Sequence, residues 1–141
     1  MKQVLLMTSF IFAIATTCCS QKINVPPAVI KAFNNKYPGA LNVKWGKESA
    51  KEYEAEFKLN GNNVSANFGT DGSWVETETA IKVTELPEAV VAAIKKNYPG
   101  AVITMAERLE EPGNKLLYET VIKMKGKKKT LEMKPDGSLA K

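Results

Sequence analysis

Residues 26–40 read PPAVIKAFNNKYPGA, and residues 87–101 read PEAVVAAIKKNYPGA. The two stretches lie 61 residues apart and are identical at eight of fifteen positions, where unrelated segments would match at roughly one. Further along the chain the spacing becomes 65, and the triplet DGS at 71–73 returns at 136–138. We infer a tandem duplication of one small module, with the four additional residues of the second copy in a loop near Glu110 to Asn114.

Each copy is predicted to begin with an amphipathic helix. Pro27 and Pro87 suit a first helical turn, and the proline of each Tyr-Pro-Gly-Ala ends the helix. Apolar residues recur at helical spacing, so that one stripe faces a core: Val29, Ala32, Phe33 and Tyr37 in the first copy, and Val90, Ala93, Ile94 and Tyr98 in the second. We therefore expect Tyr37 and Tyr98 to occupy equivalent places, each packed on its own sheet.

The apolar period changes to two after each helix, as in strands of an antiparallel sheet with one buried face. Asn60-Gly61 and Asp71-Gly72 supply turn residues between strands of the first copy. The predicted strands cover residues 41–45, 53–59, 64–68 and 74–81, then 102–107, 115–124, 128–134 and a short end from Ser138. The fold class is α+β, a tandem duplication of a helix plus a four-stranded antiparallel sheet, with repeats at 21–82 and 83–141.

The first 20 residues have the pattern of a signal peptide. Lys2 is followed by an apolar run from Val4 to Ala15 and then by small residues. The run is shorter than the roughly 20 residues of a membrane-spanning helix. We predict cleavage after Ser20 and an exported, periplasmic protein that does not span the membrane. A lipid anchor on Cys18 or Cys19 is the alternative, but Thr17 or Cys18 precedes the cysteine where a lipoprotein signal has Gly, Ala or Ser.

The mature sequence lacks the residues of common catalytic sites. It has no histidine, and both cysteines lie in the export segment, which excludes imidazole bases, thiolate nucleophiles and His/Cys zinc sites. Glu52, Glu54 and Glu56 share one strand face, and Glu76 with Glu78 share another, so a paired-carboxylate or cation site remains a formal option. A solvated sheet face is the interpretation that we favour. We predict no enzyme activity and no cofactor.

The sequence resembles the PepSY-like proteins with a beta-lactamase-inhibitor-like fold, which are small exported proteins of Bacteroidetes. The likeness rests on Tyr-Pro-Gly-Ala in both copies and on Trp45, Tyr53-x-Ala-x-Phe57, Asp71-Gly72-x-Trp74 with Glu76-x-Glu78, Leu86-Pro87 and Tyr118-Glu119. It implies that the helices lie on one face of a shared or adjoining curved sheet. It brings no catalytic residues, and it implies protein or peptide binding of an inhibitor-like kind.

The two copies differ on the predicted sheet face opposite the helices. The first copy is polar there, with Asn42, Lys44, Glu52, Glu54, Glu56 and Lys58, whereas the second has Ile103, Met105, Leu117, Glu119, Val121 and Lys123. Since an apolar face is rarely left bare to water, Ile103, Met105, Leu117 and Val121 form a candidate partner surface, for a protein, a peptide or a second copy. Packing within the chain is the other explanation.

The chain carries 20 basic and 15 acidic residues, a net charge of +5 that does not require a nucleic-acid partner. Its densest basic run holds Lys125, Lys127, Lys128 and Lys129 and is a candidate contact for lipid phosphates or anionic polymers. A solvated turn is the simpler interpretation. The sequence thus predicts a non-catalytic envelope module that captures a protein or peptide on its sheet. The alternative is a structural or stress-related envelope component that binds lipid or anionic polymer through these lysines.

Overall fold

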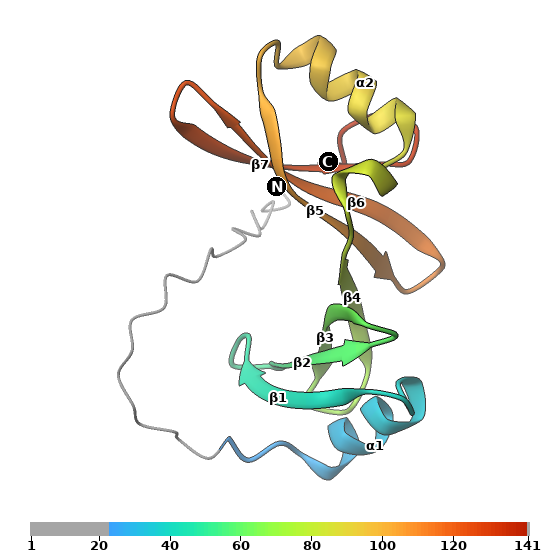
Figure 1. The fold of residues 1–141 in the computed structure, drawn as a ribbon. Coiled ribbons are helices and arrows are strands. Elements are labelled where there is room, and N and C mark those ends of the chain that lie inside the picture. Colours follow the sequence, from blue (N-terminus) through green and yellow to red (C-terminus); the bar gives the residue numbers. More distant parts are fainter. Residues whose placement is uncertain (1–22, 141) are drawn as a thin grey trace, which may run out of the picture.

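The computed structural model describes residues 23–140, so the predicted export segment with Cys18 and Cys19 lies outside the described residues. Two helices and seven strands form an α+β fold, and the strands make one antiparallel sheet in chain order (Figure 1). The elements are α1 (Pro27–Lys36), β1 (Leu41–Lys47), β2 (Glu52–Leu59), β3 (Asn62–Gly69), β4 (Trp74–Ala80), η1 (Val83–Glu85), α2 (Glu88–Asn97), β5 (Val102–Glu111), β6 (Lys115–Met124) and β7 (Lys127–Met133).

Both helices end in the same way, at the tyrosine of Tyr-Pro-Gly-Ala. The Tyr37 N–H donates to the Phe33 carbonyl at 2.8 Å, and the Tyr98 N–H donates to the Ile94 carbonyl at 2.8 Å. The φ and ψ angles are −128° and 64° at Tyr37, and −132° and 65° at Tyr98. Tyr37 is buried in one core, and Tyr98 packs against the other. The predicted equivalence of the two tyrosines is confirmed at the helix ends, but both pack on one seven-stranded sheet and not on two separate sheets.

The two Asp-Gly-Ser turns fix the helices to the sheet. Asp71 Oδ1 accepts hydrogen bonds from the N–H and hydroxyl of Ser73, and Asp136 accepts the same pair from Ser138. These bonds lower the pKa of both carboxyls. At Gly72, a Cβ atom would lie 2.7 Å from the Ala28 carbonyl oxygen of α1, so this turn approaches the helix too closely for a side chain.

The end of the second copy differs from the prediction. The prediction of a fourth strand from Ser138 is wrong. Leu139 makes one isolated bridge to Met133, and the Ala140 N–H donates to the Glu132 carbonyl at 2.9 Å. A single bridge pairs one residue on each side, so no ladder forms there among the described residues. The loop between β5 and β6 is also shorter than the predicted loop near Glu110 to Asn114, because β5 continues to Glu111 in register with β6.

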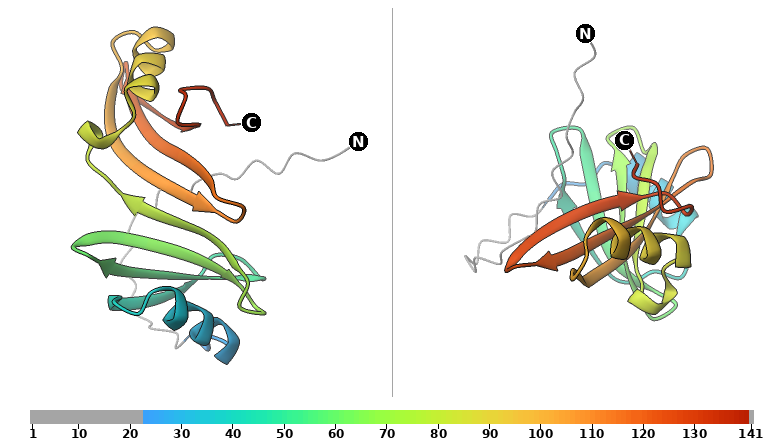
Figure 2. Two further views of the ribbon diagram at one scale, coloured as in Figure 1. Left: turned by 90° about the vertical axis from the view of Figure 1, so that its right-hand side faces the viewer. Right: turned by 90° about the horizontal axis from the view of Figure 1, so that it is seen from above.

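Both helices lie on the same face of the sheet, towards opposite ends (Figure 1). Ala66, in the α1 core, pairs with Thr77, which pairs with Glu110 on β5. Ala106, in the α2 core, lies four residues before Glu110 and so shares its face. Each helix covers its own cluster, and the sheet twists between them, so that the strands of the two ends cross when seen from above (Figure 2).

Candidate functional site

The sheet face opposite the helices, here called the open face, is covered by neither helix. Its residues are the strand residues that alternate along the chain with those facing the two cores. The strand registers place these residues side by side. Carboxylates from five strands gather on it: Glu52, Glu54, Glu56, Glu76, Glu78, Glu107, Glu111, Glu119 and Glu132. Nine of the fifteen acidic residues of a net basic chain therefore share one face.

The open face is hollowed over the first half of the sheet. An open depression of about 870 Å³ lies there, and Glu54, Glu56, Glu78 and Glu107 line it. Lys44 and Lys58 also line it, from β1 and β2. Three strands thus bring carboxylates, and β1 and β2 bring one lysine each, to one concave surface, as expected of a recognition surface for a polar partner.

Burial and mutual repulsion raise the pKa of several of these carboxyls. Burial is the first cause of the raised pKa of Glu78, to about 8, and the charges of Glu107, Glu76 and Glu119 add to it. Burial likewise raises the pKa of Glu54, Glu76 and Glu107. A nearby positive charge would lower the pKa of these carboxyls again, because it favours their ionised form.

Polar side chains of β3 support these carboxylates. Asn67 Nδ2 donates to Glu76 Oε1 at 3.0 Å, and the Ser65 hydroxyl donates to Glu78 Oε2 at 3.3 Å. Asn67 is only 8% exposed, and its Oδ1 accepts no hydrogen bond from the described residues. In the register, Asn67 lies between Glu54 and Glu76.

The predicted apolar partner surface is divided by the structure. Met105 is 39% exposed and pairs with Val121 on the open face, whereas Leu117 and Val121 are buried there, with Leu109 beside Leu117. Leu117 and Val121 are thus not accessible to a partner in this structure, and the partner surface itself stays a prediction. Met105 is the accessible residue of the four.

Ile103 lies on the other face, so the prediction that all four residues project together is wrong. It packs against the α2 core with Val90 and Ile94. The cause is a register shift between Ile103 and Met105 in the pairing of β5 with β6, because one additional residue in a strand changes the side to which its neighbours point. The pairing of β1 with β2 shifts at the equivalent place, between Leu41 and Lys44.

The four lysines of the basic run do not share a surface. Lys125 lies in the β6–β7 turn. Lys129 pairs with Ile122 on the helix side, and its Nζ lies 2.9 Å from the Tyr98 hydroxyl. Lys127 lies on the same side as Lys129, because the two are two residues apart in one strand, whereas Lys128 pairs with Lys123 on the open face. The run is therefore split between both faces.

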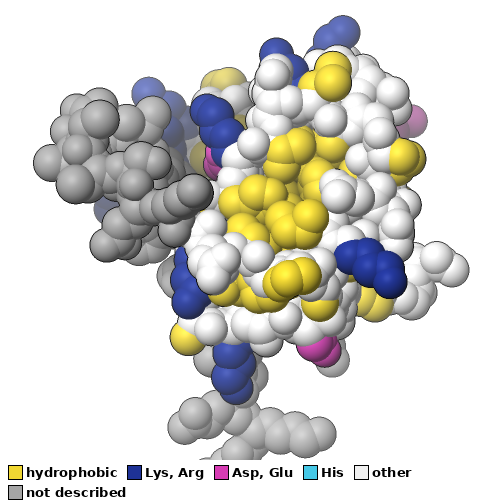
Figure 3. Space-filling view, turned by 90° about the horizontal axis from the view of Figure 1, so that it is seen from below, with side chains coloured by type: hydrophobic (Ala, Val, Ile, Leu, Met, Phe, Trp, Pro, Cys, Tyr) yellow, Lys and Arg dark blue, Asp and Glu magenta, His cyan; other side chains and the backbone are white. Residues whose placement is uncertain are grey.

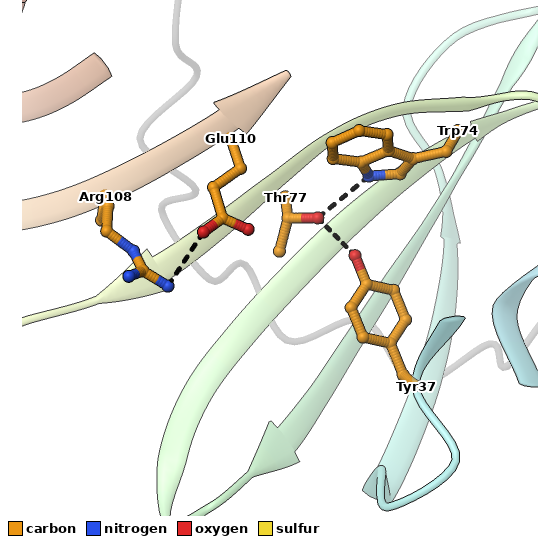
Figure 4. A network of polar contacts seen from close by, with 5 residues as sticks. All are labelled: Tyr37, Trp74, Thr77, Arg108 and Glu110. Atoms are coloured by element: carbon orange, nitrogen blue, oxygen red, sulfur yellow. Dashed lines mark hydrogen bonds and ion pairs between the residues drawn. The ribbon is translucent and has the colours of Figure 1, made fainter. Parts of the chain in front are cut away.

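The helix side carries a polar network that joins the end of α1 to β4, with an ion pair of β5 close by (Figure 4). The Thr77 hydroxyl accepts a hydrogen bond from Trp74 Nε1 at 2.9 Å and shares a short hydrogen bond with the Tyr37 hydroxyl. Arg108 and Glu110 form an ion pair at 3.1 Å nearby. Because the Tyr37 and Thr77 groups are buried in the first core, we interpret this network as structural.

Hydrophobic side chains also gather on the surface shown in Figure 3, at the end of the molecule that carries α1. The large apolar residues exposed in this half are Ile23, Leu41 and Val43. Leu41 pairs with Lys58, which places it on the open face, and Val43 lines the hollow. The hollow thus has an apolar margin beside its carboxylates.

The described residues hold no group of three or more His, Cys, Asp or Glu side chains arranged to bind a metal ion. Among them there is also no helix that is long and apolar enough to cross a membrane. The open face can accept hydrogen bonds and attract cations through its carboxylates. Sequence reasoning assigned its first half to solvent, because the strand pattern shows alternation but does not show which strands become neighbours.

A family model described as "Putative beta-lactamase-inhibitor-like, PepSY-like" matches residues 19–62 and 51–140. A structure from Bacteroides fragilis described as a BLIP-like protein has a TM-score of 0.74 at 25% identity, covering 86% of each chain. One from Bacteroides eggerthii, described among "putative periplasmic proteins", has a TM-score of 0.76 at 22% identity, covering 84% of this chain and 88% of that one.

The chain is also similar to a Mycobacterium tuberculosis protein named as a probable inactive lipase. The two are 25% identical over 116 residues, which is 77% of this chain. The chain spans only about a quarter (26%) of the length of that protein.

Proposed function

Because the chain belongs to the family of beta-lactamase-inhibitor-like, PepSY-like proteins, we propose that it is a non-catalytic module that captures a protein or peptide on the open face of its sheet. The single observation that carries this proposal is the hollow over β1 to β5, lined by side chains of five strands on a face that neither helix covers. Exposed Leu41 and Met105 lie on the same face and supply apolar contact.

We place this module in the periplasm. The signal-peptide pattern of residues 1–20 supports export, and the Bacteroides eggerthii relative is described as periplasmic. Cleavage after Ser20 predicts a mature chain that starts at Gln21. Mass measurement of protein recovered from the periplasm checks this, and a diacylglycerol-sized increase at Cys18 or Cys19 would overturn it.

The test of capture compares two double variants of the immobilised mature protein in an envelope extract. Leu41→Asp with Met105→Asp places charges on the apolar part of the open face. Val83→Asp with Leu139→Asp is the matched control, since these residues are also exposed but lie elsewhere, at 38% and 56%. We expect the first variant to lose the proteins that the wild type retains and the control to keep them, with thermal midpoints unchanged. Equal retention by both would overturn the proposal.

A further inference from the structure

We propose that the captured partner presents a lysine- or arginine-rich segment, whose cationic side chains lie between the carboxylates of the open face over β2 to β5. This inference rests on the proposed function and names the chemistry of its partner. It follows from three features of the open face: the net negative charge of its hollow, a buried acceptor without a donor among the described residues, and the shape of the hollow.

The described part of the chain compensates the charge of the hollow only in part. The described residues form two ion pairs, Arg108 with Glu110 and Lys115 with Glu111. Glu54, Glu56, Glu78 and Glu107, which line the hollow, take part in neither. Two lysines line the same hollow, but they reach no carboxylate of the described residues within ion-pair distance. The four carboxyls outnumber the two lysines, so a cationic partner would meet a net negative potential that grows when Glu78 ionises.

Asn67 is an independent sign of a ligand that donates hydrogen bonds. Its side chain is more than nine-tenths buried, and it lies in the register between Glu54 and Glu76. The amide nitrogen is bonded to Glu76, whereas Oδ1 has no donor within the described chain. A buried acceptor without a donor is costly. A guanidinium, with five N–H donors in one plane, can bond both carboxylates and Oδ1 once the glutamates move apart.

The shape of the hollow favours an extended polypeptide over a free ion or a small amine. The hollow is open, has a volume of about 870 Å³ and reaches from β1 to β5. Alternate strands lie roughly 10 Å apart, close to the roughly 9 Å that three residues span in an extended polyproline II chain, in which residues i and i+3 point to the same side. Basic residues spaced by three could therefore meet Glu56 on β2 and Glu78 on β4 in turn. The exposed Val43 and Leu41 beside the hollow suit the apolar stems of lysine and arginine.

Cation binding should be linked to proton release. The charged groups that face Glu78 are Lys44 of β1, Glu54, Glu56 and Lys58 of β2, Glu76 of β4, Glu107 of β5 and Glu119 of β6. Burial, and then the charges of Glu107, Glu76 and Glu119, favour the protonated form of Glu78, so an arriving cation drives the proton off. Affinity should rise as the pH increases from 6 to 8.5.

Octa-arginine labelled with fluorescein is the probe, and binding to the mature protein is followed by fluorescence anisotropy. Glu78→Gln with Glu107→Gln removes two charges from the hollow. Glu85→Gln with Glu88→Gln removes two exposed charges from η1 and α2. Glu85→Gln keeps a side-chain oxygen that can accept the capping bond now given by the Lys82 N–H. The two variants have the same net charge, so they separate a site from general attraction.

We expect the hollow variant to weaken octa-arginine binding at least tenfold at pH 8.5 and the control variant to change it less than twofold. Wild-type affinity should fall at least tenfold from pH 8.5 to pH 6, and octa-glutamate should not bind. Equal weakening in both variants, or no binding of octa-arginine to the wild type, would overturn the inference. That result would not affect the proposed function, which is tested separately by the capture experiment with Leu41→Asp and Met105→Asp. The two proposals can therefore fail independently.

Discussion

Glu78 lies among the carboxylates of the open face, and its pKa is raised to about 8 from an ordinary 4.5. A carboxyl with a higher pKa in the folded state binds more protons there than in the unfolded chain. Its contribution to the free energy of unfolding therefore falls as the pH rises from about 4.5 to about 8. At the scale of one residue, this carboxyl favours the folded state at acidic pH and opposes it at alkaline pH.

Glu78→Gln should remove this pH dependence, because glutamine keeps the shape and does not ionise. We expect the variant to melt roughly 3–6 °C above the wild type at pH 8.5, about 1 kcal/mol for a domain of this size, and close to it at pH 5. Thermal melts followed by circular dichroism at both values check this. Glu88→Gln, an exposed carboxyl of α2, should shift neither midpoint.

Tyr37 and Tyr98 are equivalent in sequence but differ in their partners. The Tyr37 hydroxyl bonds the buried Thr77, which also accepts from Trp74, whereas the Tyr98 hydroxyl meets the exposed Lys129. Thr77→Val leaves two groups unpaired and should cost about 2–4 kcal/mol of unfolding free energy. Tyr37→Phe should cost about 1 kcal/mol and Tyr98→Phe less. Urea unfolding measures all three, and equal losses at both tyrosines would contradict the network.

At the scale of elements, two turns with glycine at positive φ differ in how closely they approach other parts of the chain. Gly61 and Gly72 both have φ of +85°, but a Cβ atom meets nothing within 4 Å at Gly61 and lies 2.7 Å from the Ala28 carbonyl at Gly72. Gly61→Ala should cost about 1–2 kcal/mol through backbone strain alone. Gly72→Ala should cost about 2 kcal/mol more, because α1 must shift. Similar losses in urea unfolding would show that the turn does not hold the helix.

The sequence predicts each element where its period is uniform and fails where the period is interrupted. The stripe from Val29 to Tyr37 and the alternation from Tyr53 to Phe57 are read directly, since one face of each is apolar. The bulge before Met105 leaves no such sign, so Ile103 was assigned to the wrong face.

The gathering of carboxylates on the open face was likewise not predictable from one strand. Glu54, Glu78 and Glu107 come from three strands, and only the registers of β3 and β4 make them neighbours. The sequence therefore singled out Glu54, Glu56 and Glu78 but not Glu107, because the hollow depends on pairing between distant segments of the chain.

At the scale of the whole molecule, the two cores share no residue and are joined through the pairing of β4 with β5. That junction pairs Thr77 with Glu110 and Thr79 with Arg108 on one side, which is polar. We expect the two proposed repeats to unfold in separate steps. Both tryptophans, Trp45 and Trp74, lie in the first half, so the fluorescence midpoint in urea should differ from the midpoint by circular dichroism. Superimposable curves would show one cooperative unit.

The lysine run also has a role that depends on where β7 lies in the sheet. In the described part of the chain, β7 is an outer strand, and Lys127, Lys128 and Lys129 occupy its first half, before the bridge at Met133. An outer strand with unpaired backbone groups is a template for strand addition by another molecule, and adjacent lysines oppose this through charge repulsion. At the outer edge of β7, the charges of Lys127, Lys128 and Lys129 are therefore placed to oppose the addition of a further strand.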